Sequence, residues 1–303
     1  MRLAFHTLDV FTEHRFAGNP LAVVMEGDRL STEAMQRIAA EFNLSETVFL
    51  LKPANPAHSA RMRIFTPATE LAFAGHPTIG TAALIADLRS LSVNGEQDAI
   101  CTLEQSIGTV RVGVRLKAGA AAFAEFDAPK LPEEAGALPS TERLAAAVGL
   151  LPGEIGFANH KPRRFTAGSA FAYIPVTSLE AISKARVDMS YWRAAFPGIA
   201  INGAYLYTRE CEHNTSSFHA RMFAPESGVA EDPATGSAAV GLAGVLQHFD
   251  AYPDGTHKRV IEQGIEMGRP SLIQLTLAVT RGRLETVRIG GNAVRVSEGT
   301  LAV

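Results

Sequence analysis

The chain has 303 residues, of which 47% are hydrophobic and 19% are charged, a composition typical of a soluble protein long enough for two domains. Its net charge of −3 leaves no basic excess to neutralise phosphates, so we expect no nucleic-acid partner. Cys101 and Cys211 lie far apart, which excludes a disulfide framework or a zinc ribbon. No apolar stretch reaches the roughly 18 residues that span a membrane. We therefore expect a cytoplasmic protein without a membrane partner.

The predicted elements are mostly short strands. Residues 1–14 alternate apolar and polar positions and lack the apolar core of a signal peptide. Strands then follow at "LAVVM", "TVFLL" and "RMRIF", before a long apolar helix after Pro77. Further strands lead to a second apolar helix after Pro233, and "LIQLTLAV", "ETVRIGG" and "AVRVS" end the chain. Because neither helix has a clean polar face, we expect both helices to be buried.

The two helix regions repeat one pattern. Residues 63–88, "RIFTPATELAFAGHPTIGTAALIADL", and residues 221–246, "RMFAPESGVAEDPATGSAAVGLAGVL", both begin with Arg-x-Phe-x-Pro. Their matching positions are Pro77 with Pro233, Gly80 with Gly236 and Thr81 with Ser237. The ordered series favours two similar halves over two unrelated strand-loop-helix units. We place the first half at residues 1–117 plus about 288–303, and the second at 118–287, because "KAGAAA" interrupts the strands near residue 118.

The two helix starts are candidate ligand sites. Asp232 before Pro233 is a good N-cap followed by proline at the first helical position, so capping alone would explain both residues. A buried helix start also offers N–H groups and positive dipole charge to an anion, and Gly236 and Ser237 would let it approach. The other start, residues 75–78, carries His76 where the second carries Asp232. Two different titratable groups suit an asymmetric proton-transfer site.

Glu46 is the third candidate. A glutamate at the entrance of a strand is commonly only a solvated charge, but one held beside a cleft could have a pKa raised by burial. Arg63 and Arg221, in the matching strands, could pair with acids or contact an anionic ligand, and pairing is the more common role. No His-Glu-x-x-His, phosphate-binding loop, Gly-x-Gly-x-x-Gly or Gly-x-Ser-x-Gly motif occurs, so we expect no metal and no nucleotide cofactor.

Several stretches, in the same order, resemble the PhzF-like phenazine-biosynthesis family, which is related in fold to the diaminopimelate epimerases. They are "GNPLAVV" (18–24), "NLSETVFL" (43–50), "RIFTPATELAFAGHPTIGTA" (63–82), "EDPATGSAA" (231–239) and "QGIEMGRPS" (263–271). The resemblance implies an α+β fold of two pseudo-symmetric halves, each a β-barrel-like sheet around a central buried helix. It also implies an active site in the cleft between the halves, and a homodimer.

The resemblance also implies residue roles. Glu46 matches the family's acid/base glutamate, and His76 and Asp232 match its other catalytic positions. Ser45, Gly75, Gly236 and Ser237 are the expected substrate-binding residues. The epimerase relatives carry a cysteine at each helix start, where this chain has Gly75 and Asp232, so a two-thiol racemisation lacks its nucleophiles.

The sequence thus predicts a cofactor-independent isomerase that moves a proton on a small carboxylate-bearing metabolite by carboxylate general acid/base catalysis. The alternative is a small-anion-binding or oligomeric interaction protein without catalysis. The substrate, and any part in phenazine synthesis, stay open, because a fold and a general site can outlast a particular function.

Overall fold

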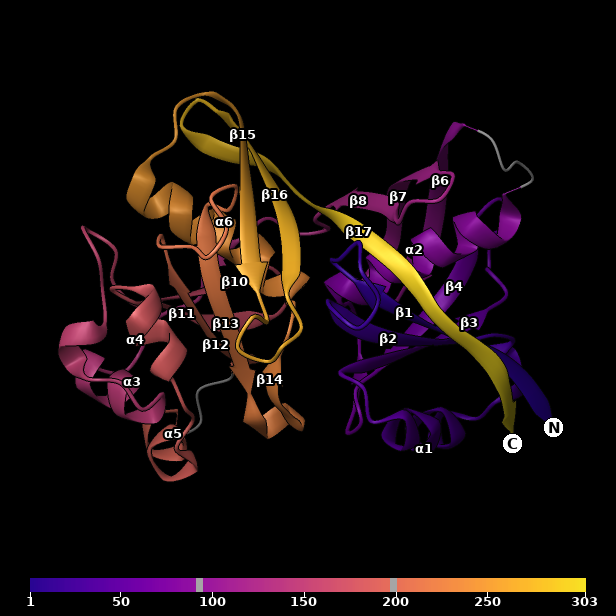
Figure 1. Ribbon diagram of the computed structural model, residues 1–303, viewed down its shortest axis with the longest axis horizontal. Coiled ribbons are helices and arrows are strands. Elements are labelled where there is room, and N and C mark those ends of the chain that lie inside the picture. The colour runs from indigo at the N-terminus through magenta and orange to yellow at the C-terminus, as the bar shows by residue number, and fades with distance from the viewer. Residues whose placement is uncertain (91–94, 197–200) are drawn as a thin grey trace. The chain divides into compact units, whose positions relative to one another are not determined.

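The computed structural model describes residues 1–90, 95–196 and 201–303, and the chain divides into two compact units (Figure 1). The first unit contains Met1–Pro129, Gly268–Leu272 and Ile289–Val303; the second contains Lys130–Met267 and Ile273–Arg288. The chain therefore first passes from the first unit to the second after Pro129, later than the boundary at 117/118 predicted from the sequence. Its cause is strand β8 (Ala122–Asp127), which pairs with β7 (Gly108–Lys117) and so belongs to the first unit. The short return at Gly268–Leu272 was not predicted.

The strands of the first unit close into a barrel. Besides β7 and β8 they are β1 (Arg2–Val10), β2 (Asn19–Val24), β3 (Glu46–Leu51), β4 (Ala60–Phe65), β5 (Glu70–Leu71), β6 (Glu96–Gln105) and the last part of β17 (Arg283–Ala302). The β2–β3 and β4–β6 pairs are parallel, and β1–β2, β3–β4, β6–β7 and β7–β8 are antiparallel. The ring closes because β17 pairs with both β8 and β1.

Helix α2 (Gly75–Arg89) runs through this barrel, with every residue from Gly75 to Ala86 buried. The apolar sequence of the helix follows from this position, because its whole circumference faces strands. Gly80 lets the wall approach closely: a Cβ atom there would lie 2.6 Å from a methyl carbon of Leu21. The prediction of a buried central helix is confirmed for this unit.

Helix α1 (Thr32–Phe42) lies outside the barrel, after a short 3₁₀ turn, η1 (Gly27–Arg29). Its apolar face places Met35 and Ala39 against Phe49 and Phe65. This helix was not predicted from the sequence, although serine is a typical N-cap residue. In the structure Ser31 is the N-cap, and its side chain accepts the N–H of Ala34.

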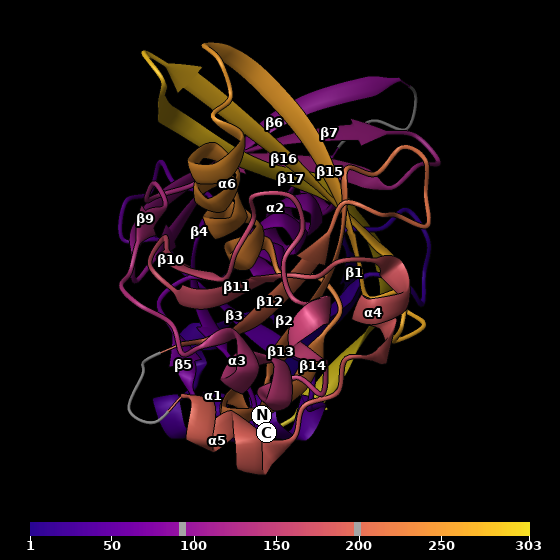
Figure 2. The same ribbon diagram turned by 90° about the vertical axis from the view of Figure 1, so that its left-hand side faces the viewer.

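The second unit repeats the arrangement. Its strands are β9 (Glu133–Glu134), β10 (Arg163–Thr166), β11 (Ala170–Pro175), β12 (Gly203–Thr208), β13 (Phe218–Ala224), β14 (Val229–Asp232), β15 (Gly255–Gln263), most of β16 (Ser271–Thr280) and the start of β17. The β11–β12 and β13–β15 pairs are parallel around the antiparallel β12–β13 pair, the order found for β2, β3, β4 and β6. Figures 1 and 2 show β15, β16 and β17 continuing this sheet.

Helix α6 (Gly236–Asp250) is the central helix of this unit and packs against β10 and β11 (Figure 2). Gly241 is needed here, because a Cβ atom would overlap the hydroxyl of Tyr173. That hydroxyl donates to the carbonyl of Ala238 at 2.8 Å and so ties β11 to the helix. Each unit thus wraps a sheet around a buried helix, as predicted.

Three short helices make an outer layer on the second unit: α3 (Thr141–Ala147), α4 (Leu179–Lys184) and α5 (Met189–Ala195). Two 3₁₀ turns, η2 (Pro152–Glu154) and η3 (Pro225–Ser227), lie in its loops. Trp192 and Ile182 from this layer pack against Ile174 and Leu206 of β11 and β12. The sequence-based reading did not predict these helices, which are too short to show a clear period. Across the described ranges, no helix is long and apolar enough to cross a membrane.

Candidate active site

Two of the predicted catalytic residues meet in the first unit. Glu46 opens β3, beside Leu21 of the parallel strand β2, and His76 is the second residue of α2. The Nε2 atom of His76 lies 3.4 Å from Oε2 of Glu46, and the two side chains are only 4% and 15% exposed. The start of one strand and the start of the central helix therefore bring an imidazole and a carboxyl group together.

His76 is uncharged at neutral pH, because burial lowers its pKa to about 3. The positive end of the α2 dipole also disfavours an imidazolium in the first turn. The contact with Glu46 is therefore not an ion pair. A neutral imidazole nitrogen can donate to a carboxylate or accept from a protonated carboxyl group, so this pair can pass a single proton.

The start of α2 surrounds His76 with small residues. Gly75 is the first helical residue and is buried, and the N-cap Ala74 has no side chain that could cap the helix. The first turn contains no acidic residue. Pro77 is the third helical residue, where its missing N–H still costs no helical bond. Ser45, directly before Glu46, is half-buried.

Asp232 lies at the corresponding place in the second unit, but it does not cap the helix. It is the last residue of β14, pairs with Met222 of β13 and is buried. Helix α6 begins at Gly236 with Thr235 as its N-cap, so the predicted capping role of Asp232 and the first helical position of Pro233 are wrong. The carboxylate instead accepts a hydrogen bond from Thr235 Oγ1 to Oδ2, at 2.6 Å.

The first turn of α6 keeps the features of an anion site. Gly236 is buried, Ser237 is half-buried, and the turn contains no acidic residue that would offset the helix dipole. The Thr235 hydroxyl does not cap the helix, because it is directed to Asp232. Both helix starts can therefore offer N–H groups and positive dipole charge to a carboxylate.

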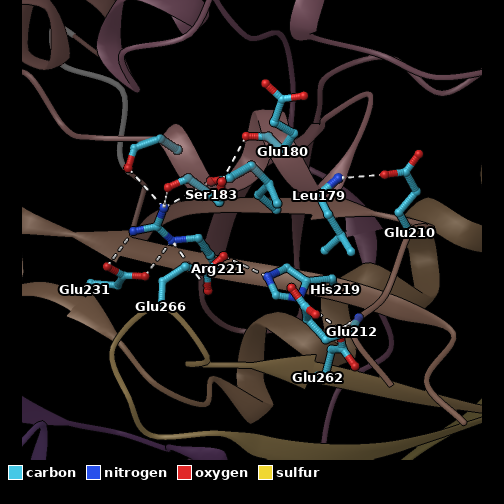
Figure 3. Close-up of polar contacts among 12 residues, drawn as sticks. Leu179, Glu180, Ser183, Glu210, Glu212, His219, Arg221, Glu231, Glu262 and Glu266 are labelled. Carbon is cyan, nitrogen blue, oxygen red and sulfur yellow. Dashed lines mark hydrogen bonds and ion pairs between the residues drawn. The ribbon is translucent and has the colours of Figure 1, made fainter. Parts of the chain in front are cut away.

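The arginines of the repeated motif pair with acids in both units. Arg221 donates from Nε and Nη2 to both carboxylate oxygens of Glu231, at 2.8 and 2.9 Å (Figure 3). Arg63 holds Glu70 in the same way, at 2.7 and 2.6 Å. These bidentate pairs fix β5 and β14, the strands that lead to the two helix starts. The structural role for Arg63 and Arg221 is thereby confirmed, and the repeat extends to side-chain contacts.

A cluster of charged residues around the buried His219 lies beside Arg221. His219 bonds Glu262 through Nδ1 and Glu266 through Nε2, each at 2.9 Å (Figure 3). Burial alone would lower the pKa of His219, but the hydrogen bonds to the two carboxylates outweigh it and raise that pKa to about 9. Glu266 also lies 4.0 Å from Nε of Arg221. His219 is thus a buried cation held between two anions, a feature that the sequence-based reading left unassigned.

Neither cysteine is a candidate nucleophile. Cys101 is buried in β6, and burial raises its pKa. The pKa of Cys211 is raised to about 12, first by burial and then by the charge of Glu262. Both thiols stay protonated at neutral pH, so neither is a reactive thiolate.

The comparisons with known proteins cover nearly the whole chain. A family model described as phenazine biosynthesis-like protein matches residues 8–299. The chain is 50% identical over 298 residues to the uncharacterized isomerase mll1393 of Mesorhizobium japonicum, covering 97% of each chain. It is 34% identical over 298 residues to trans-2,3-dihydro-3-hydroxyanthranilate isomerase of Pseudomonas aeruginosa, covering 96% of each.

Solved structures share the fold. A phenazine biosynthesis protein of the PhzF family from Bacillus anthracis superimposes with a TM-score of 0.88 at 23% identity, covering 100% of both chains. A hydroxyproline epimerase from Agrobacterium vitis gives a TM-score of 0.65 at 13% identity, covering 99% of this chain and 91% of that one. The predicted fold class is confirmed. The chain belongs to the phenazine biosynthesis-like family, and it is an isomerase.

Proposed function

We propose that the protein is a cofactor-independent isomerase that moves a proton on a small carboxylate-bearing metabolite, with Glu46 as the general acid/base. The observation that carries this proposal is the buried contact between Glu46 and the neutral His76. Simple binding of an anion would not need a carboxyl group next to an anion-attracting helix start. The relatives named as trans-2,3-dihydro-3-hydroxyanthranilate isomerases suggest the substrate class: a ring that carries a carboxylate, an amine and a hydroxyl.

In the proposed reaction the Glu46 carboxylate removes a proton from a carbon made acidic by a neighbouring π-system. The C–H electron pair enters that π-system, the double bonds shift, and a proton is added at another carbon. Substrate and product have the same composition, so no oxidant or reductant takes part. Glu46 itself, or His76 in contact with it, returns the proton.

The proposal also assigns substrate-binding roles to residues at the start of α6. We propose that Asp232 binds the amine or hydroxyl of the substrate, while the first turn of α6 at Gly236 and Ser237 binds its carboxylate. Ser45 and Gly75 would also contact the substrate. These assignments follow the family positions and the acid-free helix starts. A homodimer is part of the proposal, and the mass in solution tests it against the chain mass of 32.3 kDa.

The test is an incubation in D₂O with trans-2,3-dihydro-3-hydroxyanthranilate, followed by NMR. We expect isomerisation with deuterium incorporated at carbon, and a loss of about 10²- to 10⁴-fold in Glu46→Gln. Glu41→Gln, an exposed glutamate near the end of α1, is the matched control and should behave as wild type. Full turnover in Glu46→Gln would remove Glu46 from the mechanism.

The alternative, a binding protein without catalysis, predicts a different result. Tight binding of this probe with no isomerisation and no exchange would support it. The Asp232→Ala variant provides a second test, because it removes both a proposed binding group and the contact with Thr235. We expect a kinetic loss together with a lower melting temperature in that variant, so both have to be measured.

A further inference from the structure

The side-chain amide of Gln263 is completely buried at the end of β15, and both of its polar atoms make two hydrogen bonds. Nε2 donates to the main-chain carbonyl of Asp232 at 2.7 Å and to Thr235 Oγ1 at 3.1 Å. Oε1 accepts from the main-chain N–H of Thr235 at 3.2 Å and from the hydroxyl of Tyr205 at 3.3 Å. Gln263 therefore contacts both Asp232 and Thr235, the N-cap of α6.

The direction of each bond is fixed by chemistry. A main-chain carbonyl only accepts and a main-chain N–H only donates, so the Gln263 amide has one possible orientation. Because Thr235 Oγ1 accepts from Gln263, its own proton is available for Oδ2 of Asp232. Hydrogen bonds thus run in one direction from Tyr205 and Gln263 through Thr235 to the Asp232 carboxylate. Burial and the charge of Asp232 both raise the pKa of Tyr205, which keeps its hydroxyl a donor.

We infer that Gln263 is a positioning residue: through Thr235 it fixes the Asp232 carboxylate at the start of α6 as a hydrogen-bond acceptor. The inference rests on the proposed function for what Asp232 does with substrate. It assigns Asp232 to holding a donor group of the substrate. Return of the proton is then left to Glu46 and His76.

In the first unit, Gln105 makes a similar but smaller set of contacts at the start of α2. Gln105 is the last residue of β6, as Gln263 is the last residue of β15, and each directly follows a glutamate. The two strands also pair alike, because β6 is parallel to β4 and β15 is parallel to β13. Gln105 Nε2 donates to Thr78 Oγ1 at 3.0 Å, and Thr78 donates to the carbonyl of Ala74, the N-cap of α2, at 2.7 Å. Both glutamines thus brace a central-helix start, but only the bonds from Gln263 lead to a carboxylate.

The glutamates before these glutamines are also matched. Glu104 accepts the main-chain N–H groups of Ala54 and Asn55, at 2.8 and 2.9 Å. Glu262 accepts those of Glu212 and His213, at 2.6 and 3.1 Å. The strand end that carries each glutamine is therefore anchored to a neighbouring loop, which makes it a firm base for positioning.

Thr235→Val is the main test, since it replaces the hydroxyl with a methyl group of similar size. We expect kcat/KM to fall by about 10- to 100-fold, as for a misplaced binding group, while Thr235→Ser stays within about threefold of wild type. Thr208→Val is the matched control: Thr208 is also buried, and its hydroxyl accepts the N–H of Glu210 rather than bonding a carboxylate. Wild-type kinetics in Thr235→Val would overturn the inference.

A double-mutant cycle shows whether Thr235 acts through Asp232. In an Asp232→Asn background, Thr235→Val should change kcat/KM by less than about twofold, because the oriented carboxylate is already gone. An undiminished loss in that background would contradict the inference. Gln263→Met, which cannot donate or accept in the same way, should resemble Thr235→Val and should also be non-additive with Asp232→Asn.

A substrate-free measurement separates this inference from the proposed function. In wild type the two Gln263 side-chain N–H signals should exchange slowly with solvent and should shift in Thr235→Val. Slow exchange in a protein that neither isomerises nor exchanges the probe would refute the proposed function and leave the positioning intact. Exchange as fast as that of an exposed glutamine would refute the positioning, whatever the activity.

Discussion

His76 Nε2 and Glu46 Oε2 lie 3.4 Å apart in a buried contact in which the imidazole carries no charge. A charged partner would only hold the carboxylate in place, whereas a neutral imidazole can exchange roles with it as donor and acceptor. The two residues are therefore expected to work as one unit. This expectation leads to the first prediction.

His76→Asn should lower kcat for the proposed isomerisation by about 10- to 100-fold, because asparagine keeps polarity but cannot relay a proton. The double variant with Glu46→Gln should be no slower than Glu46→Gln alone, as found for residues that act together. His6→Asn is the control, since His6 is also buried in the first unit and has its own contact with Glu298. Additive losses in the double variant would show that His76 and Glu46 act separately.

The neutral state of His76 also predicts a pH dependence of stability. Its pKa is about 3 when folded and near 6.5 when unfolded, so between these values the unfolded chain binds more protons. The free energy of unfolding should therefore fall as the pH drops below 6.5, by about 2 kcal/mol at pH 5 from this residue. Urea unfolding at pH 5 and pH 7 measures the effect, which should be smaller in His76→Asn. An equal pH effect in that variant would assign it to other groups.

His219 predicts a pH dependence of stability with the opposite sign. Its pKa is raised to about 9 by two carboxylates, so it stabilises the folded state below pH 6.5 and loses this contribution as the pH rises through 9. We expect about 2 to 3 kcal/mol to be lost between pH 6.5 and 9. His219→Gln can still bond Glu262 and Glu266 but carries no charge. It should be less stable than wild type at pH 6.5 and nearly equal to it near pH 10, as measured by melting temperature.

The sequence predicted the parts of this structure that depend on local pattern. The repeated motif located both central helices, because helices surrounded by strands must be apolar on every face. His76 and Asp232 lie in the same motif, whereas the role of Glu46 was inferred from the family resemblance. The sequence-based prediction failed where long-range contacts decide: Asp232 looks like an N-cap, but pairing with Met222 keeps it in a strand. Gln263 was noticed only as part of a motif, since no local feature shows that its amide reaches Thr235 from 28 residues away.

A last prediction concerns the loop between β1 and β2. Phe16 has a left-handed backbone, with φ of 69°, although its side chain is 73% exposed and so gains little from packing. The loop is fixed by Asp9, which accepts the N–H of Phe16 at 2.6 Å and is itself bound by Arg269 at 2.5 Å. The conformation is therefore imposed on Phe16 by its surroundings, and a residue without a Cβ atom should adopt it more easily.

Phe16→Gly should be more stable than Phe16→Ala by about 0.5 to 1 kcal/mol, even though glycine is the more flexible residue when unfolded. Both variants remove the exposed ring, so the difference between their melting temperatures reports the backbone alone. Arg281, another exposed residue with a positive φ of 54°, provides a second site at which Gly should exceed Ala. If glycine is more stable than alanine at position 281 but not at position 16, the hydrogen bond from the N–H of residue 16 to Asp9 does not hold this residue in the left-handed region in solution.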